Sequence, residues 1–290
     1  MSPIDHFSYG PLTLLVAYGM SSIGSMLGLL LTSRARLVSA REARYWLAGA
    51  AVAIGGTGIW TMHFIAMLGF SVQGTVIRYD MPLTAASAVL AVVVVGAGLF
   101  VVWRGGERAP YLIGGGVLTG IGVAGMHYLG MSAMNMAGDV TYDPLFVALS
   151  VLIAIAAATV ALWFTLRVRG ALKIGGAALV MGVAVTGMHY TGMYGMSVHA
   201  HDLAGPVTGA KAIDFLLPLI VGLSVITMGL LLTVMLSPSE KELHREAEFR
   251  ARLEGRPLPV KPQGPQPQGG ARTAQNGGAP DVDLFGTPRS

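Results

Sequence analysis

Seven apolar stretches constrain this 290-residue chain more than any other feature of its sequence. Each is long enough to cross ~30 Å of hydrocarbon as a helix that rises ~1.5 Å per residue. None has an Asp, Glu, Lys or Arg in its middle, and charged residues make up only 12% of the chain. The sequence therefore predicts an all-α, polytopic membrane protein with seven transmembrane helices. The predicted spans are 11–32, 45–70, 82–103, 111–136, 145–166, 174–197 and 213–236.

Lys and Arg residues between the stretches predict which way the chain crosses the membrane. Nine follow the first, third and fifth stretches (Arg34, Arg36, Arg41, Arg44, Arg104, Arg108, Arg167, Arg169, Lys173), and the other loops hold Arg78 and Lys211. Because cytoplasmic loops are enriched in Lys and Arg, the N-terminus is expected outside and the C-terminus in the cytoplasm. The first stretch lacks a basic start and a cleavage site, so it is expected to be a retained helix. The net charge of +4 then reflects the orientation of the chain in the membrane. Because the basic residues are spread over the loops and form no patch, no nucleic-acid partner is expected.

The composition changes after the last stretch and predicts three regions. Residues 8–236 form the seven-helix domain, and residues 237–254 are predicted to be a short charged helix. Residues 255–290 are rich in Pro, Gly and Gln, and such segments cannot bury enough apolar surface to fold. A disordered tail is therefore expected there, and because no catalytic domain fits in it, the chain is not expected to be an enzyme.

An internal repeat organises the spans. Three segments align, Gly58–Met67, Gly122–Met131 and Ala184–Met193, and each carries a Met-His pair. The histidines His63, His127 and His189 are spaced by 64 and 62 residues, so each period covers two helices. The repeats are therefore expected to be parallel, giving three two-helix units plus a seventh helix. Glycines precede each motif and are expected to let the helices approach closely. They are Gly55, Gly56, Gly58, Gly120, Gly122, Gly125, Gly182 and Gly187.

The repeat predicts that the three histidines lie at one depth in the membrane, close to the outer ends of their helices. In every copy a second Met follows four residues after the His, which places both side chains on one helix face. Nine of the 16 methionines fall in these three windows, so their excess is localised. The expected metal ligands are His63, His127, His189, Met67, Met131 and Met193. Additional ligands or supporting residues are Met62, Met126, Met188, Tyr128, Tyr190, Met134 and Met196, the last two extending the same helix face by a turn.

Imidazole and thioether donors favour copper, Cu(I) especially, over magnesium or calcium. Neutral donors also suit a membrane interior, where an unpaired carboxylate is costly. A His/Met or bis-His haem is a second possibility, because such pairs ligate haem iron. With no cysteine in the chain, thiolate sites are excluded.

Structural roles are the alternative for each of these residues. A membrane histidine is often a hydrogen-bonded packing residue, Met at helical spacing is usually core, and Tyr near a membrane boundary is usually an anchor. In the last loop, His199, His201 and Asp202 resemble a metal-binding His-x-His pattern, but a solvated polar loop is the favoured interpretation. Asp80, Asp139 and Asp143 are likewise expected to be solvated loop charges.

The repeated motif resembles the MHYT-domain family of bacterial membrane sensors over residues 8–235. The full Met-His-Tyr-Thr string occurs at Met188–Thr191, the second copy reads Met-His-Tyr-Leu at Met126–Leu129, and the first reads Met-His-Phe-Ile at Met62–Ile65. The resemblance implies a bacterial plasma-membrane protein that binds copper near the outer face through Met, His and Tyr. It further implies sensing of a diatomic gas (oxygen, carbon monoxide or nitric oxide) or of redox state.

Family members often continue into a cyclic di-GMP enzyme or a kinase. The resemblance therefore implies a separate cytoplasmic signalling partner here, or an oligomer. A copper carrier or membrane metallochaperone would use the same ligands. However, no Met or His ladder continues to the inner helix ends, which counts against transport. A haem-binding membrane enzyme ranks lower, because no general acid–base pair lies near the histidines.

Overall fold

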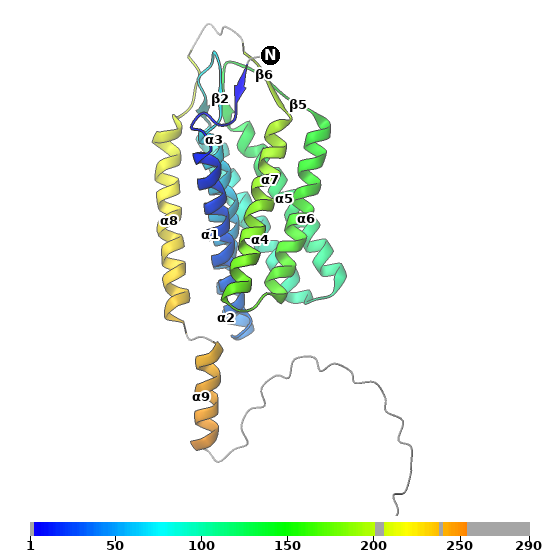
Figure 1. Cartoon of the computed structure of the whole chain (residues 1–290), viewed down its shortest axis with the longest axis vertical. Coiled ribbons are helices and arrows are strands. Elements are labelled where there is room, and N and C mark those ends of the chain that lie inside the picture. Colours follow the sequence, from blue (N-terminus) through cyan, green and yellow to red (C-terminus); the bar gives the residue numbers. More distant parts are fainter. Residues whose placement is uncertain (1–2, 201–205, 238–239, 254–290) are drawn as a thin grey trace, which may run out of the picture. The chain divides into compact units, whose positions relative to one another are not determined.

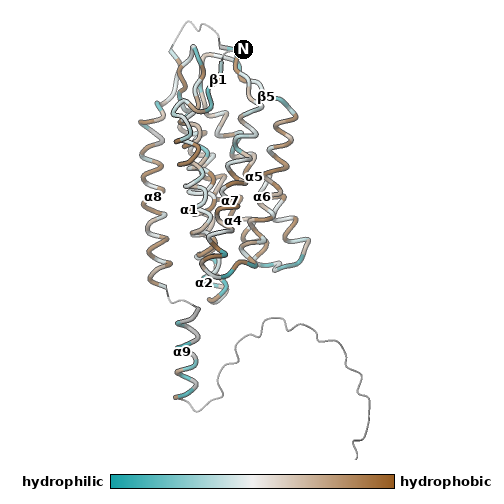
Figure 2. Tube along the Cα trace, viewed as in Figure 1, coloured by the Kyte–Doolittle hydropathy of each residue, from teal (hydrophilic) through white to brown (hydrophobic). Residues whose placement is uncertain are grey.

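The structure, a computed structural model, describes residues 3–200, 206–237 and 240–253. As predicted, seven of its helices are long and apolar enough to cross a membrane. Figure 1 shows these helices running side by side, and Figure 2 shows that they are largely hydrophobic along their length. Six are α1 (Leu12–Ala35), α4 (Met81–Gly105), α5 (Ala109–Ser132), α6 (Pro144–Arg167), α7 (Ala171–Tyr194) and α8 (Ala212–Leu236). The remaining span is continuous over α2 (Ala40–Ala51), the π-helix η1 (Val52–Thr61) and α3 (Met62–Leu68).

In the described part of the chain, three short antiparallel sheets that were not predicted from the sequence join the loops at one end of the bundle. They pair β1 (Ile4–Asp5) with β2 (Ser71–Val72), β3 (Arg78–Tyr79) with β4 (Met134–Asn135), and β5 (Gly138–Tyr142) with β6 (Met196–Ala200). We call this the strand end of the bundle. The opposite end carries the α1–α2, α4–α5 and α6–α7 connections, and we call it the basic end.

Two predicted spans ran too far toward the strand end. Helix α5 ends at Ser132 and α7 ends at Tyr194, whereas the predicted spans continued to residues 136 and 197. Met134 and Met196 therefore do not extend the helix face by another turn, because they lie in β4 and β6. In both places the chain leaves the helix to pair with a strand from an earlier loop.

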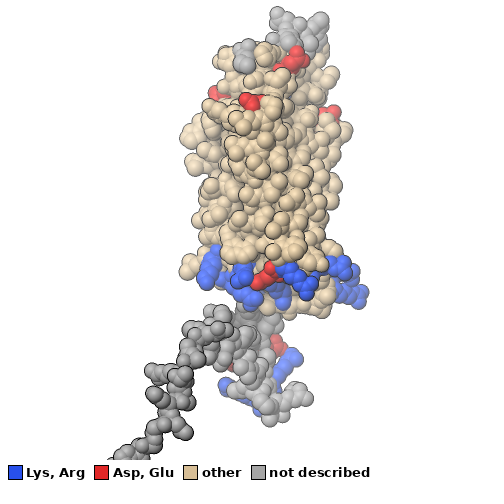
Figure 3. Space-filling model, turned by 90° about the vertical axis from the view of Figure 1, so that its right-hand side faces the viewer, with Lys and Arg blue, Asp and Glu red and all other residues tan. Residues whose placement is uncertain are grey.

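The two ends of the bundle differ in the sign of their charged side chains. Figure 3 shows Lys and Arg side chains gathered as a belt at the basic end, while the other end of the visible face carries acidic residues. Two of these arginines also donate hydrogen bonds to backbone carbonyls at the C-terminal ends of helices. Arg34 donates to the carbonyl oxygens of Val234 and Ser237, and Arg36 donates to those of Thr165 and Val168. These bonds supply donors to carbonyls at the helix ends, where the intrahelical pattern runs out, and the Val234 carbonyl also accepts the backbone N–H of Ser237.

Two aspartates at the strand end act as helix N-caps, a role that the sequence did not predict. Asp80 accepts a hydrogen bond from the backbone N–H of Leu83 at 2.8 Å, and Asp143 accepts one from Leu145 at the same distance. They cap the N-termini of α4 and α6, each followed by a proline in the first turn. Such caps satisfy backbone donors that would otherwise lack partners, so these residues are more than solvated loop charges.

Close helix approach depends on some of the predicted glycines and not on others. A Cβ built on Gly55 would lie 2.6 Å from the carbonyl oxygen of Ala91, and one on Gly120 would lie 2.4 Å from Cα of Ile155. Both helix pairs thus meet backbone to backbone. A Cβ on Gly125 or Gly187 would meet nothing within 4 Å, so the expectation was wrong for these two positions.

Helix α9 (Glu240–Leu253) lies in a second compact unit that begins at Ser239, separate from the unit formed by Met1–Pro238. It falls within the stretch 237–254 for which a charged helix was predicted. The predicted disordered tail, 255–290, lies outside the described residues.

Candidate metal centre

Three helices bring the three repeated histidines to one point. His63 lies on α3, His127 on α5 and His189 on α7, and each side chain is only 1% exposed. Their Nδ1 atoms form a triangle whose sides are 3.0 Å (His63–His189), 3.2 Å (His63–His127) and 3.3 Å (His127–His189). We call these residues the histidine triad. The expected convergence of the three side chains is therefore present.

The dimensions of the triad match those of a metal site. A triangle with these sides has its corners about 1.8 Å from its centre, close to the ~2.0 Å of a metal–imidazole bond. The rings are nearly perpendicular to one another, with interplanar angles of 84°, 83° and 89°. Each ring can therefore direct an Nδ1 lone pair inward without stacking on its neighbours. In the described part of the chain, no carboxylate belongs to this group.

Hydrogen bonding among the imidazoles cannot satisfy all three rings at once. A neutral imidazole carries one N–H, and an Nδ1–H points along one direction, whereas each Nδ1 here has two close neighbours. A single cation at the centre would accept all three lone pairs together. The donor chemistry and the spacing therefore both fit a bound metal ion.

Glycines on neighbouring helices make room for two of the imidazoles. A Cβ built on Gly130 would lie 2.5 Å from Nε2 of His63, and one on Gly192 would lie 2.6 Å from Nε2 of His127. Both Nε2 atoms are buried and have no hydrogen-bond partner among the described residues. These glycines are not among the site residues predicted from the sequence, although each follows its own helix's histidine by three residues. The corresponding position of the first copy is Ala66.

An aromatic side chain follows each histidine and packs edge-on against its ring. Phe64 lies 4.7 Å from His63, Tyr128 lies 4.8 Å from His127, and Tyr190 lies 5.0 Å from His189, measured between ring centroids. A second aromatic ring contacts each of these in turn, and the three pairs are Phe64–Tyr79, Tyr128–Tyr142 and Tyr190–Phe7. These rings help to bury the triad.

The two tyrosines of the motif differ in what their hydroxyls do. The hydroxyl of Tyr128 bonds to Ser150 Oγ on α6 at 2.8 Å, whereas the hydroxyl of Tyr190 is buried without a partner among the described residues. At the strand end, burial and the neighbouring Tyr128 raise the pKa of Tyr142 to about 12, so this phenol stays neutral at physiological pH.

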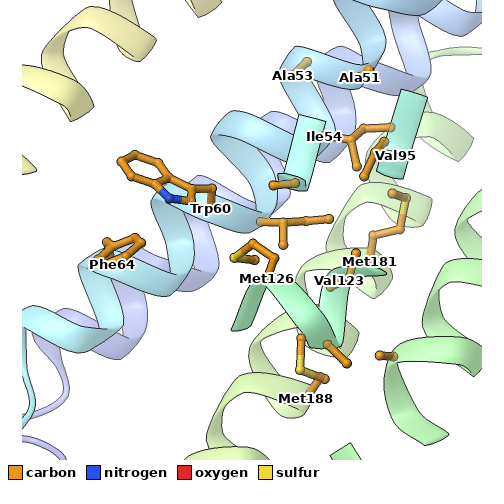
Figure 4. Close-up of a cluster of buried hydrophobic side chains, with 14 of the residues drawn as sticks. Ala51, Ala53, Ile54, Trp60, Phe64, Val95, Val123, Met126, Met181 and Met188 are labelled. Atoms are coloured by element: carbon orange, nitrogen blue, oxygen red, sulfur yellow. The ribbon is translucent and has the colours of Figure 1, made fainter. Parts of the chain in front are cut away.

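All the expected methionines of the three windows are buried. Met67, Met131 and Met193 lie on the strand-end side of their histidines, and Met62, Met126 and Met188 directly precede them. Met134 and Met196 are buried in the strands β4 and β6. Figure 4 shows Met126 and Met188 among the apolar side chains of the bundle interior. A core role therefore accounts for their burial, and a ligand role for any of them is a proposal.

The last loop does not join the triad. His199 is exposed in β6, where it pairs with Asp139 of β5. His201 and Asp202 lie outside the described residues.

A known family model matches the part of the chain that carries the first two copies of the Met-His motif. The MHYT family model, described as a bacterial signalling protein N-terminal repeat, matches residues 56–115 and 120–177. These matches contain His63 and His127, and the third copy that the sequence predicts around His189 lies outside them. No solved structure matches the chain.

Curated relatives are larger signalling proteins. The chain is 39% identical over 235 residues to the bifunctional diguanylate cyclase/cyclic di-GMP phosphodiesterase MucR of Pseudomonas aeruginosa, covering 76% of this chain and 33% of that protein. It is 32% identical over 210 residues to the signaling protein YkoW of Bacillus subtilis, covering 69% of this chain and 26% of that protein. The chain thus spans about a third or less of the length of these relatives. With its seven candidate spans, the chain belongs to the MHYT family of multi-pass membrane signalling proteins.

Proposed function

We propose that this chain is a non-catalytic sensor of the bacterial plasma membrane that binds copper at the histidine triad and responds to a diatomic gas or to redox state. The observation that supports it most is the triangle of three buried Nδ1 atoms, 3.0 to 3.3 Å apart. A buried site of this kind, built from residues far apart in the sequence, is more than packing requires. The relatives named as signalling proteins support the sensory role.

Copper is the metal that these donors favour. Three neutral imidazoles without a carboxylate suit a monovalent ion in a low-dielectric interior, because a divalent ion would leave two positive charges unbalanced. His63, His127 and His189 would hold the ion, with Met67, Met131 or Met193 available as an additional ligand. A copper ion held there would supply a redox couple and a coordination position for a small ligand.

The chain's own residues supply the rest of the site. The edge-on aromatic rings of Phe64, Tyr128 and Tyr190 would exclude water from the triad. Haem is disfavoured, because Nδ1 atoms 3.0 to 3.3 Å apart leave no space for a macrocycle between two imidazoles.

We place the strand end outside and the basic end in the cytoplasm, with the N-terminus outside and the C-terminus inside. The belt of Lys and Arg at the basic end supports this orientation. The signal would leave on the cytoplasmic side toward a separate signalling protein. Because one relative is named as a cyclic di-GMP enzyme, we propose a partner in cyclic di-GMP signalling.

Copper content measured after reconstitution tests the proposal. The protein is purified in detergent, loaded with Cu(I) under a reductant, freed of excess metal and subjected to elemental analysis. We expect about one copper per chain, held by borderline nitrogen donors, and little or none in the variants His63→Ala, His127→Ala and His189→Ala. The matched control is His199→Ala, which changes an exposed histidine outside the triad and should leave the copper content unchanged.

Two results would overturn the proposal: a wild-type protein that remains free of copper, or triad variants that retain as much copper as the wild type. A copper carrier or metallochaperone is the alternative function. It would bind the metal at the same residues but would move it across or along the membrane in a vesicle transport assay, which a sensor would not.

A further inference from the structure

An apolar cavity of about 50 Å³ lies inside the bundle. Side chains from η1, α4, α5, α6 and α7 line it. Figure 4 shows part of this lining, with Ile54, Val95, Val123, Met181 and Met188 meeting in the interior from four different elements. No residue of the histidine triad lines this space, so it is distinct from the metal centre described above.

The repeat relates the cavity to the triad. Ile59, Val123 and Val185 each precede a triad histidine by four residues, and all three line the cavity. Four residues of helix correspond to a rise of about 6 Å, so the cavity begins about one turn from the triad on the side of the basic end. Met188, which also lines the cavity, is the residue directly before His189.

The lining excludes water on chemical grounds. Besides apolar side chains, the lining contains the hydroxyls of Thr119 and Thr165. Thr119 donates to the carbonyl oxygen of Val94 at 3.4 Å, and Thr165 donates to that of Leu162 at 2.6 Å. Because a buried water needs about two to four polar partners, the cavity should stay dry, as apolar cavities that bind xenon do.

Small residues form the wall between α6 and α7. Ala154, Ala157, Ala158 and Ala161 line the cavity at the spacing of a single helix face, and Ala184 faces it from α7. Ala157, Ala161 and Ala184 are only half-buried, so this wall reaches the surface of the span, where the membrane lipid lies. A small apolar molecule dissolved in the bilayer therefore has only a thin wall to cross.

We infer that this cavity is a binding site for a small apolar molecule of one or a few atoms, such as a diatomic gas, that enters from the bilayer between α6 and α7. Binding itself is independent of copper. Only its use as the route by which a gas reaches the triad rests on the function proposed above.

Xenon binding to the metal-free protein, followed by NMR, tests whether the cavity takes up a small apolar molecule. The protein carries ¹³C-labelled methionine methyl groups, and its NMR spectrum is recorded in detergent under increasing xenon pressure. We expect saturable shifts of the Met181 and Met188 methyl signals, which are assigned with the variants Met181→Leu and Met188→Leu. Met228 is 65% exposed on α8 and serves as the reference for non-specific effects of xenon dissolved in detergent.

A substitution that fills the cavity tests whether the shifts come from xenon bound inside it. Ala158→Leu places three extra carbons in the cavity and should abolish the saturable shifts. The matched control is Ala156→Leu, which adds the same atoms on the exposed face of the same helix and should preserve them. If Ala158→Leu does not fold, Ala161→Leu takes its place, because that residue lines the same cavity.

The inference is overturned if the wild-type signals of Met181 and Met188 shift no more than that of Met228, or if the filled variant responds as the wild type does. Copper content is measured on the same variants and should stay at the wild-type value in Ala158→Leu. The xenon measurement and the copper measurement can therefore fail separately, which distinguishes an error about the cavity from an error about the triad.

Discussion

At the scale of single residues, two glycines determine where the triad imidazoles can lie. The space for a Cβ at Gly130 is taken by Nε2 of His63, and that at Gly192 by Nε2 of His127. Heavy atoms do not approach a real Cβ closer than 3.0 Å, so a methyl group must push the imidazole away by at least about 0.5 Å at Gly130 and about 0.4 Å at Gly192. These displacements are close to the tolerance of a preorganised site, ~0.5 Å.

Gly130→Ala and Gly192→Ala should therefore weaken copper binding without removing any ligand. We expect a loss of about 10- to 100-fold in affinity, the range seen when the residues that orient metal ligands are changed. Competition with a Cu(I) chelator measures it. Gly125→Ala is the control on the same helix as Gly130, because its added Cβ would meet nothing within 4 Å. Equal affinities for Gly130→Ala and Gly125→Ala would contradict this account of the site.

The two motif tyrosines should respond differently to loss of their hydroxyls. Tyr128→Phe removes a hydrogen bond to Ser150 and should lower the free energy of unfolding by about 1 kcal/mol. Tyr190→Phe removes a buried hydroxyl without a partner among the described residues and should cost nothing or stabilise the protein slightly. Thermal unfolding in detergent compares the two. A larger loss of stability in Tyr190→Phe than in Tyr128→Phe would contradict this prediction.

The sequence predicted the triad but not its details. A Met-His pair recurring every two helices was enough to infer that three imidazoles lie at one depth. Which ring nitrogen faces the centre depends on side-chain rotation, and the role of Gly130 and Gly192 depends on which helices are neighbours. Neither can be inferred from a period alone.

At the scale of helices, backbone contact rather than side-chain interlocking holds parts of the bundle together. Gly55, in η1, touches the backbone of α4, and Gly120, in α5, touches the backbone of α6. Such close contacts matter in lipid, because apolar side chains gain little by exchanging lipid contacts for contacts with one another, and van der Waals packing must hold the helices together. The π-helical turns of η1 directly precede α3 and His63, and wide turns of this kind occur often at functional sites.

Gly120→Ala should accordingly destabilise the packing of α5 on α6. Its Cβ would lie 2.4 Å from a backbone atom that cannot move aside by rotation, so we expect a loss of about 1 to 3 kcal/mol. Gly114→Ala on the same helix meets open space and should leave stability unchanged or slightly higher. Unfolding curves of the two variants provide the measurement, and equal stabilities would show that the helices separate easily there.

Helix spans were predictable because each apolar stretch is long and uncharged. The strands were not, because they are two to five residues long and pair with loops far away in the sequence. That is also why α5 and α7 were predicted to continue through Met134 and Met196. Apolar residues in a short buried strand look the same in sequence as one more helical turn.

At the scale of the whole membrane unit, the two ends of the bundle should face different compartments. The chain contains no cysteine, so single cysteines can report on each end without a background. Val76 is 64% exposed at the strand end, and Leu172 is 93% exposed at the basic end. In intact cells a membrane-impermeant maleimide should label Val76→Cys, and it should label Leu172→Cys only after the membrane is opened. The reverse pattern would invert the proposed orientation.

The central claim is that three converging histidines form a copper site. The most direct test is X-ray absorption at the copper edge of the Cu(I)-loaded protein. The spectrum should show three nitrogen neighbours at about 2.0 Å, with the outer-shell scattering of imidazole rings. In His189→Ala, any residual copper should have fewer imidazole neighbours. A wild-type spectrum without imidazole scattering, or one unchanged by His189→Ala, would contradict the claim.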